Sequence, residues 1–245
     1  MSPIVLIPAR LAATRLPNKP LADIAGLPLI VRVLRQAERA DIGPVAVAAG
    51  DPEIVAAVQG AGGRAVLTDP ALPSGSDRVR AALEALDPEA RHDVVVNLQG
   101  DIPFIDPGAV RACAELLRVQ PDCDIGTLAV QNASPADAAN PDVVKAVLSL
   151  AEPPTRGRAL YFTRSPPFGE GPFWHHQGVY AYRREALVRF TAAPPSPLER
   201  REKLEQLRAL ELGLSIWAAV IAEAPAEVNN PADLAAARAL AERLR

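Results

Sequence analysis

The chain has 245 residues and a formal net charge of −3, with 49% hydrophobic and only 4% aromatic residues. This length and composition suit one α/β domain whose core consists mostly of Ala, Val, Leu and Ile. A mildly acidic chain is unsuited to nucleic acid as its main partner, because phosphate backbones bind to basic surfaces. The two cysteines, Cys113 and Cys123, have neither a metal-ligand spacing nor a disulfide pattern, so we expect both to be structural.

No apolar run approaches the roughly 20 residues that a membrane-spanning helix needs. Ser2 and Pro3 lead directly into a strand pattern, without the features of a signal peptide. Free cysteines suit a reducing compartment. We therefore expect a soluble cytoplasmic protein that does not bind membranes.

Strand and helix patterns alternate along the first half of the chain. Strands are predicted at 4–7, 44–49, 65–67 and 93–98, and helices from near Leu27, after Pro52 and from about Asp77 to Leu86. This alternation is typical of a parallel sheet with helices on both faces. The glycine-rich segment 60–65 follows a predicted helix rather than a strand, so we interpret it as a helix end and not as a dinucleotide site.

From about Ile125 the pattern changes to strands joined by proline-rich loops. Strands are predicted at 126–130, 143–150, 176–182 and 215–221, and helices at 184–190, 197–212 and 231–244. We expect this half to add strands to the sheet and to build a lobe of its own.

The loop after the first strand carries three cations, Arg10, Arg15 and Lys19. Open α/β sheets bind ligands at the carboxyl ends of their strands, where this loop lies. Two guanidinium groups and an ammonium group can neutralise a polyanion such as a triphosphate. Prolines restrict the loop, which makes a plain solvated basic loop the less favoured alternative. The sequence has no G-x-x-x-x-G-K-[ST] pattern, so the loop is not of the common P-loop kind.

Asp101 follows the strongest predicted strand through Gln99 and Gly100. It therefore lies on the same edge of the predicted sheet as the basic loop. A carboxylate beside a triphosphate is suited to hold Mg²⁺. The alternative is a helix cap, but Asp106 with Pro107 already fills that role.

Several segments resemble a known family. Residues 8–20 resemble the signature loop of the sugar nucleotidyltransferases, and the closest match is the 3-deoxy-D-manno-octulosonate (KDO) cytidylyltransferase family. The further matching segments, in the order found in that family, are 74–78, 97–103, 159–164, 176–180, 195–199 and 204–208. The resemblance covers nearly the whole chain, and its specific parts are 176–180, 195–199 and 204–208.

The resemblance implies a Rossmann-like three-layer α/β sandwich with a mixed, mostly parallel sheet and a small lobe for the acceptor and for dimerisation. Within a single domain, residues 1–124 would form the nucleotide-binding half, and residues 125–245 the sugar-binding and dimerisation half. The implied reaction joins CTP and KDO to give CMP-KDO and pyrophosphate, a step in lipopolysaccharide biosynthesis. Mg²⁺ is the implied cofactor, and a homodimer the implied assembly.

The resemblance also implies roles for individual residues. The residues implied to act in catalysis are Arg10, Arg15, Lys19 and Asp101. Those implied to bind the nucleotide are Ala9, Arg10, Thr14, Lys19, Ser74, Gly75 and Arg78. Those implied to bind the sugar are Gln99, Arg164, His176, Tyr180, Glu205 and Gln206.

Each of these polar residues also has a structural interpretation. Ser74 suits a helix N-cap as well as a pyrimidine contact. Arg164 could be a surface residue rather than a cation for a sugar carboxylate, and His176 a hydrogen-bonded strand residue. Glu205 could lie on a solvated helix face rather than accept from sugar hydroxyls. Ser196 and Glu199 form an S-x-x-E capping box, so we assign them a mainly structural role.

The chain departs from the family pattern at Asn229. The family has V-D-T-P-x-D-L here, with its Asp as a second metal ligand, whereas this chain has an amide at that position. An amide oxygen can bind Mg²⁺ but brings no charge, so we expect a weaker metal site at Asp101 and Asn229. Asp233 is expected inside the last helix and turned elsewhere, and the segment also suits a turn and helix cap.

Two alternative functions stay open. The first is a cytidylyltransferase for another acidic sugar, such as 8-amino-KDO or a sialic acid. The second is a non-catalytic protein that binds a nucleotide or nucleotide sugar, which the neutral Asn229 favours. Comparison of acceptors tests the first, and CTP binding without pyrophosphate release would support the second.

Overall fold

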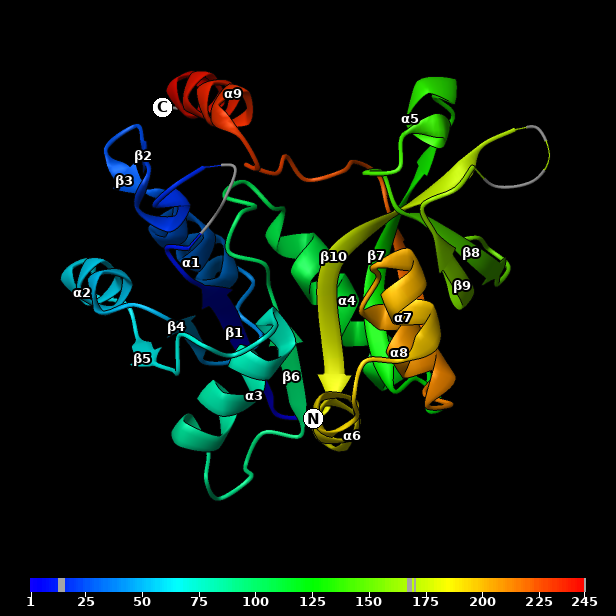
Figure 1. The fold of residues 1–245 in the computed structure, drawn as a ribbon, viewed down its shortest axis with the longest axis horizontal. Helices are drawn as coiled ribbons and strands as arrows, with labels where there is room; N and C mark the ends of the chain where they lie inside the picture. Colours follow the sequence, from blue (N-terminus) through cyan, green and yellow to red (C-terminus); the bar gives the residue numbers. More distant parts are fainter. Residues whose placement is uncertain (13–15, 167–168, 170, 245) are drawn as a thin grey trace. The chain divides into compact units, whose positions relative to one another are not determined.

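The computed structural model describes residues 1–12, 16–166, 169 and 171–244, and Figure 1 shows its ribbon. The chain forms two compact units. Unit 1 comprises residues 1–111 and 225–245, and unit 2 comprises residues 112–224. These boundaries differ from the expected halves, because the C-terminal segment belongs to the same unit as the N-terminal one. Helix α4 (Pro107–Val119) begins in unit 1 and ends in unit 2.

Unit 1 contains a parallel sheet with the strand order β5-β4-β1-β6. Its strands are β1 (Pro3–Ala9), β4 (Val45–Ala49), β5 (Ala65–Leu67) and β6 (Val94–Asn97). Strand β1 lies between β4 and β6, and its residues Ile4 to Ile7 are at most 1% exposed. Burial on both faces explains why β1, β4 and most of β6 are continuous apolar runs.

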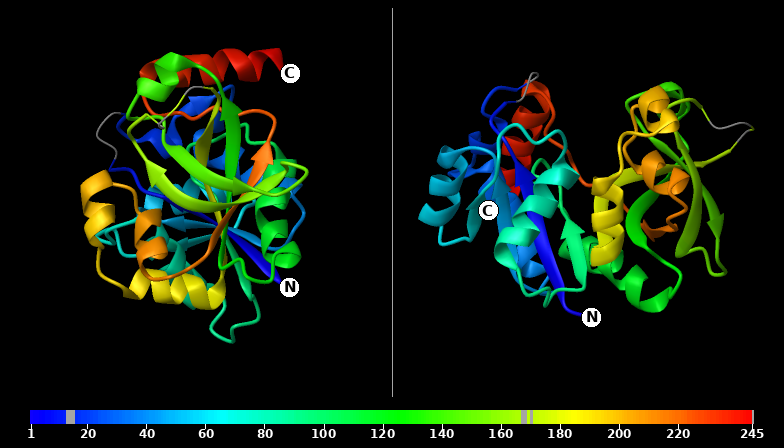
Figure 2. Two further views of the ribbon diagram at one scale, coloured as in Figure 1. Left: turned by 90° about the vertical axis from the view of Figure 1, so that its right-hand side faces the viewer. Right: turned by 60° about the horizontal axis from the view of Figure 1, so that its bottom comes forward.

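The helices of unit 1 are α1 (Leu29–Arg39), α2 (Pro52–Gly60), α3 (Gly75–Leu86) and α9 (Pro231–Arg243). Right-handed crossovers put α1 and α2 on one face of the sheet and α3 on the other. The direction of strand order therefore reverses between β1 and β6, which is where open sheets form ligand crevices. Helix α9 lies beside the hairpin of β2 (Asp23–Ile24) and β3 (Leu27–Pro28), and Arg238 Nε donates to Asp23 O at 2.8 Å (Figures 1 and 2).

Unit 2 contains five strands in the order β10-β7-β11-β9-β8, and β8 also pairs with β10. The strand pairings therefore form a closed cycle. The strands are β7 (Ile125–Asn132), β8 (Lys145–Leu150), β9 (Arg156–Thr163), β10 (Phe173–Arg183) and β11 (Ile216–Ile221). Only the β7–β11 pairing in this set is parallel. The unit's short helices are α5 (Pro135–Ala139), α6 (Arg184–Ala192), α7 (Pro197–Glu202) and α8 (Gln206–Glu211).

The mixed α/β architecture is confirmed, but the single helix predicted at 197–212 is wrong. The structure has α7 and α8 instead, separated by Lys203 in the left-handed conformation with φ 56°. Arg164 explains the break, because its guanidinium donates to the carbonyls of Glu202 and Lys203, which a continuous helix would use internally. The predictions also missed β9 and the β2–β3 hairpin.

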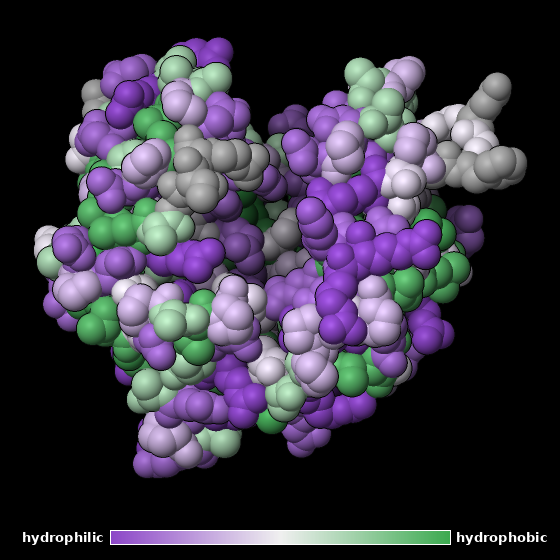
Figure 3. Space-filling model, viewed as in Figure 1, coloured by the Kyte–Doolittle hydropathy of each residue, from purple (hydrophilic) through white to green (hydrophobic). Residues whose placement is uncertain are grey.

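Both cysteines are buried and free, as expected for structural residues. Burial raises the pKa of the Cys123 thiol to about 12 and that of Cys113 further still, so both are unreactive thiols near neutral pH. Among the described residues, no helix is long and apolar enough to cross a membrane. The face drawn in Figure 3 is mainly hydrophilic, with small apolar areas between the polar ones.

Candidate functional site

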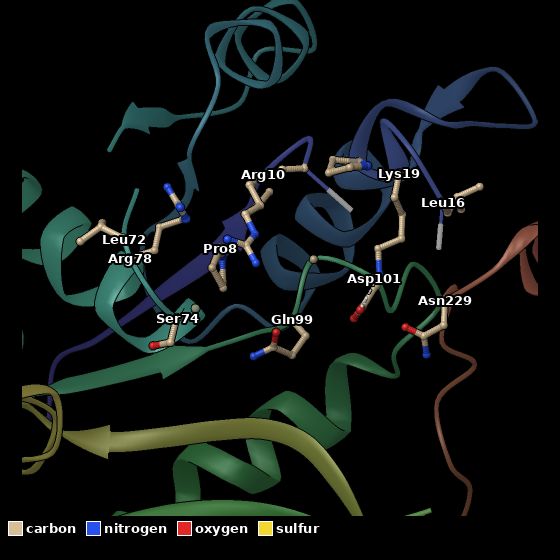
Figure 4. A pocket seen from close by; sticks show the side chains of 15 residues that line it. Pro8, Arg10, Leu16, Lys19, Leu72, Ser74, Arg78, Gln99, Asp101 and Asn229 are labelled. Carbon is tan, nitrogen blue, oxygen red and sulfur yellow. Dashed lines mark hydrogen bonds and ion pairs between the residues drawn. The ribbon is translucent and has the colours of Figure 1, made fainter. Parts of the chain in front are cut away.

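A pocket of about 360 Å³ lies in unit 1, where the loops that follow β1 and β6 meet. Figure 4 shows its lining side chains. Its lining includes nine residues that the sequence predicted for the site: Ala9, Arg10, Lys19, Ser74, Gly75, Arg78, Gln99, Asp101 and Asn229. The apolar part of the lining includes Ala12, Leu16, Pro20 and Leu72. Thr14 and Arg15 lie outside the described residues.

The basic loop is anchored to the end of β4 at its first turn. Gly50 N–H donates to Ala9 O at 2.8 Å, and Leu11 N–H donates to Asp51 Oδ2 at 2.7 Å. These bonds fix the backbone on either side of Arg10, which lines the pocket from an otherwise exposed position. Asp51 was missed from sequence, although it follows a predicted parallel strand and so lies on the ligand-binding edge of the sheet.

Gly100 brings Asp101 against the end of β1. A Cβ atom at position 100 would lie 2.9 Å from Pro8 O and 3.3 Å from Ile30 Cδ1, so a larger residue would push the two loops apart. Val228 N–H donates to Asp101 O at 2.9 Å and joins the segment before α9 to the same turn. The turn is thus held on two sides, which fixes the place of the carboxylate.

Lys19 and Asp101 form an ion pair within the pocket. Lys19 Nζ lies 2.9 Å from Asp101 Oδ2, and the two side chains are 18% and 24% exposed (Figure 4). Lys19 is presented by the one-turn helix η1 (Lys19–Leu21), which follows Asn18 in a left-handed conformation. In this structure the charges of Lys19 and Asp101 neutralise each other. With a ligand, the ammonium group could bind phosphates and the carboxylate could bind a metal ion.

Asn229 and Asn230 have different roles at the start of α9. Asn230 Oδ1 accepts from the N–H groups of Ala232 and Asp233, and Asp233 Oδ2 accepts from those of Asn229 and Asn230. This is a complete capping box, so Asp233 lies in α9 as expected, with its carboxylate turned back toward the cap rather than lining the pocket. The cap does not use the side chain of Asn229, which lines the pocket.

Glu227 contacts that side chain, and sequence reasoning did not identify it. Asn229 Nδ2 donates to Glu227 Oε2 at 2.8 Å. Partial desolvation, followed by the nearby Asp101 carboxylate, raises the pKa of Glu227, while the Asn229 hydrogen bond lowers it. The two residues are only two positions apart, but no motif in the sequence signals their contact.

The part of the pocket lined by Asp101 and Asn229, here called the metal corner, has oxygen ligands that fit a divalent cation. Asp101 offers a carboxylate and Asn229 an amide oxygen, both hard ligands of the kind that Mg²⁺ prefers. Because the Asn229 nitrogen faces Glu227, its oxygen is the end left for a cation, and Figure 4 draws that oxygen on the side of Asp101. A site with only two protein ligands suits Mg²⁺, because this ion commonly completes its coordination shell with water and substrate phosphates.

Arg78 and Ser74 shape the opposite wall of the pocket. Arg78 is 2% exposed, and its Nη1 donates to Thr68 Oγ1 at 2.6 Å and to Asp69 O at 3.1 Å. Burial and the neighbouring Arg10 lower the pKa of Arg78. Ser74 caps α3 by accepting from Asp77 N–H. Both residues thus have structural partners in addition to their place in the pocket lining.

The other residues predicted for sugar binding belong to unit 2. His176 is 8% exposed, and its Nε2 lies 3.0 Å from Thr127 Oγ1, which itself donates to Val179 O at 2.8 Å across a bulge in β10. Burial, with a smaller effect of His175, lowers the pKa of His176 to about 3, so the ring is neutral near pH 7. The His176 and Tyr180 rings lie 5.5 Å apart.

Arg164 is tied to backbone carbonyls. Its guanidinium donates to Glu202 O at 2.9 Å, Pro141 O at 2.7 Å and Lys203 O at 3.2 Å. Glu205 Oε1 lies 3.5 Å from Arg208 Nη2, and Gln206 is 7% exposed at the start of α8. Sugar binding by these residues stays a prediction.

Known proteins were compared with this chain. A family model of cytidylyltransferases matches residues 4–216. A 3-deoxy-manno-octulosonate cytidylyltransferase of Rhodospirillum centenum is 59% identical over 240 residues, 98% of this chain and 93% of that protein. One from Methylobacterium radiotolerans is 58% identical over 244 residues, 99% of this chain and 98% of that protein.

Two solved structures are also similar to this chain. A structure of CMP:2-keto-3-deoxy-manno-octonic acid synthetase complexed with CTP is 36% identical, with a TM-score of 0.92 over the full length of both chains. A nucleotidyl transferase from Methanothermobacter is 16% identical with a TM-score of 0.60, covering 100% of this chain and 99% of that one. The second likeness supports the fold alone.

Proposed function

This chain belongs to the cytidylyltransferase family, and on that premise we propose that it transfers CMP from CTP to 3-deoxy-manno-octulosonate and releases pyrophosphate. The observation that carries the proposal is the pocket in which Arg10 and Lys19 meet Asp101 at the carboxyl ends of parallel strands. The relatives named above act on this sugar, and the solved relative with 36% identity was determined with CTP.

In the proposed reaction, the anomeric hydroxyl oxygen of the sugar forms a bond to the α-phosphorus of CTP. The bond from that phosphorus to the bridging oxygen breaks, pyrophosphate leaves with its electrons, and the hydroxyl proton passes to water. The protein contributes mainly position and charge, as in phosphoryl transfer generally. Arg10, Arg15 and Lys19 would stabilise the negative charge on the departing pyrophosphate.

Asp101 and Asn229 would hold Mg²⁺, which supplies positive charge beside the phosphate oxygens when it is bound. Lys19 would then exchange its contact with Asp101 for one with a phosphate. Ser74, Gly75 and Arg78 would face the cytosine, and Ala9 and Thr14 would lie along the nucleotide. The sugar site would be formed by Gln99, Arg164, His176, Tyr180, Glu205 and Gln206.

We also propose a homodimer that is formed through unit 2. Strands β8 and β9 carry three exposed apolar side chains, Val147 at 41%, Leu150 at 38% and Leu160 at 56%. Exposed apolar side chains grouped on adjacent strands are suited to association. Light scattering during size-exclusion chromatography should give twice the chain mass, and a Leu160→Glu variant should give the monomer mass.

The test is pyrophosphate release from purified protein with CTP and KDO during a titration of Mg²⁺. Release should require both substrates and the metal, and Asn229→Asp should shift the metal curve to lower concentration, because it restores a charged ligand. Preference for another acidic sugar over KDO would reassign the acceptor. CTP binding with no release at any metal concentration would favour a non-catalytic binder, the alternative that the neutral Asn229 suggests.

A further inference from the structure

We propose that Glu227 is a positioning residue for Asn229, fixing its amide so that the oxygen, and not the nitrogen, faces the cation. This inference rests on the proposed function, because it concerns the metal corner of the same pocket. It assigns a role to a residue outside the pocket lining and outside the sequence motifs.

The hydrogen bond between the two side chains sets the orientation. A carboxylate only accepts hydrogen bonds, so the group 2.8 Å from Glu227 Oε2 is the amide nitrogen of Asn229. The amide oxygen then lies on the other side, toward Asp101 (Figure 4). A reversed amide would present N–H groups to a cation and would leave two oxygens facing each other at Glu227.

The backbone around Asn229 is held by hydrogen bonds, so the orientation of the side-chain amide is what remains to be fixed. Val228 N–H donates to Asp101 O at 2.9 Å, and Asn229 N–H donates to Asp233 Oδ2 at 2.8 Å. The position of Asn229 is therefore set from both sides, while rotation of its terminal amide is governed by Glu227. Groups that orient a metal ligand typically change metal affinity by about 10–100-fold when they are removed.

An aspartate at position 229 would not need this help. Its two oxygens are equivalent, so rotation of the carboxylate costs no ligand, and it has no N–H to donate to Glu227. Glu227 should therefore matter for metal affinity only when residue 229 is an amide. This dependence separates positioning from a general effect of the negative charge, which would act with either residue.

The experiment measures binding of Mn²⁺ to the full-length protein, from the loss of the free-ion signal in electron paramagnetic resonance. Glu227→Ala should weaken binding by about tenfold. Glu227→Gln keeps an acceptor oxygen and should stay within about threefold of the unchanged protein, because the carboxamide can rotate to accept from Asn229. In the Asn229→Asp background, Glu227→Ala should change affinity by less than about threefold, because the oriented bond is absent.

Glu223→Ala is the matched control, because it removes a carboxylate from an exposed position four residues earlier on the same segment and should leave Mn²⁺ affinity unchanged. Glu227 is itself exposed, so the variants should fold, which thermal unfolding verifies. The inference is overturned by an unchanged affinity in Glu227→Ala, by equal losses in both backgrounds, or by a Glu227→Gln loss as large as that of Glu227→Ala. The proposed function fails separately, through the absence of pyrophosphate release, while the Mn²⁺ measurements need no turnover.

Discussion

Lys19 in unit 1 and Arg164 in unit 2 are two cations that the protein holds in different ways. In unit 1, Lys19 and Asp101 face each other inside a pocket, and each is partly exposed. In unit 2, Arg164 donates to three backbone carbonyls, and buried Lys145 donates to Asn140 O and Arg164 O. Lys19 and Asp101 thus form a partly exposed pair that a ligand can separate, whereas Arg164 and Lys145 hold loops in place through backbone carbonyls.

This difference shows what a sequence match leaves undetermined. The residue type at a matched position identifies the region of a site, but the partner that a side chain already has decides what remains for a ligand. If the contrast is sound, substitutions at the Lys19–Asp101 pair should mainly change activity, and substitutions at the buried Glu199–Arg208 pair of unit 2 should mainly change stability.

The largest effect is expected at Lys19. Lys19→Met removes the ammonium that we assign to the triphosphate, and pyrophosphate release should fall by about 10²–10³-fold, as when one charge-stabilising group is lost from an active site. The measurement is the steady-state rate of release at saturating CTP. Arg118→Ala, at an exposed cation paired with Glu115, should keep the original rate. A Lys19→Met protein with the original rate would remove Lys19 from the mechanism.

Glu199→Ala tests the structural character of unit 2. Glu199 accepts two hydrogen bonds of 2.7 Å from Arg208, whose side chain is 7% exposed and lies over the Phe190 ring. Its loss removes a carboxylate that binds the buried guanidinium through two hydrogen bonds and leaves the longer 3.5 Å contact with Glu205, so the free energy of unfolding should fall by about 3 kcal/mol. Urea unfolding measures this change. Glu84→Ala breaks an exposed pair with Arg80 and should lower it by less than about 0.5 kcal/mol; equal losses in the two variants would contradict the contrast.

His176 predicts a pH dependence of stability. Its pKa falls from 6.5 to about 3 on folding, mainly because burial disfavours the charged ring. Between these values the unfolded chain binds a proton that the folded protein excludes, so the free energy of unfolding decreases as pH falls. The His176 share of this loss from pH 7 to pH 5 is about 2 kcal/mol. Urea unfolding of the unchanged protein and of His176→Gln should give different slopes, and identical slopes would show that His176 is not the group responsible.

The smallest effect is expected at Asp51, which acts on the basic loop through its backbone. Asp51→Ala removes the acceptor for Leu11 N–H and should raise the KM for CTP by about tenfold, the value of one hydrogen bond to a charged group. Asp51→Asn keeps an acceptor oxygen and should recover most of the loss. An unchanged KM in Asp51→Ala would mean that the loop is fixed by its other contacts alone.

Much of unit 1 could be predicted from sequence. The apolar runs of β1, β4 and β6 indicate buried parallel strands, and the carboxyl ends of such strands lie along one edge of the sheet. Arg10, Lys19 and Asp101 follow those ends, so their meeting in one pocket was predictable without the structure. The capping boxes at Ser196 and Asn230 are local patterns as well.

Features that depend on distant contacts could not be predicted. Strand β9 contains Arg156 and Arg158 and acquires its structure by pairing with β11 and β8. The break at Lys203 depends on Arg164, 39 residues earlier. The contact between Glu227 and Asn229 is short in sequence, but its place in the pocket depends on the bond from Val228 N–H to the distant Asp101 O.

That bond from Val228 to Asp101 has a consequence for the order in which the protein matures on the ribosome. Unit 1 is made of two stretches of chain, with all of unit 2 synthesised between them. At about 5–20 residues per second, the interval from Asp101 to Asn229 takes on the order of ten seconds. During that time the nascent chain has its basic loop and Asp101 but not the segment that contributes Asn229 to the pocket. On the proposed function, the growing polypeptide would complete its site for a metal-bound nucleotide only after translation has passed position 229.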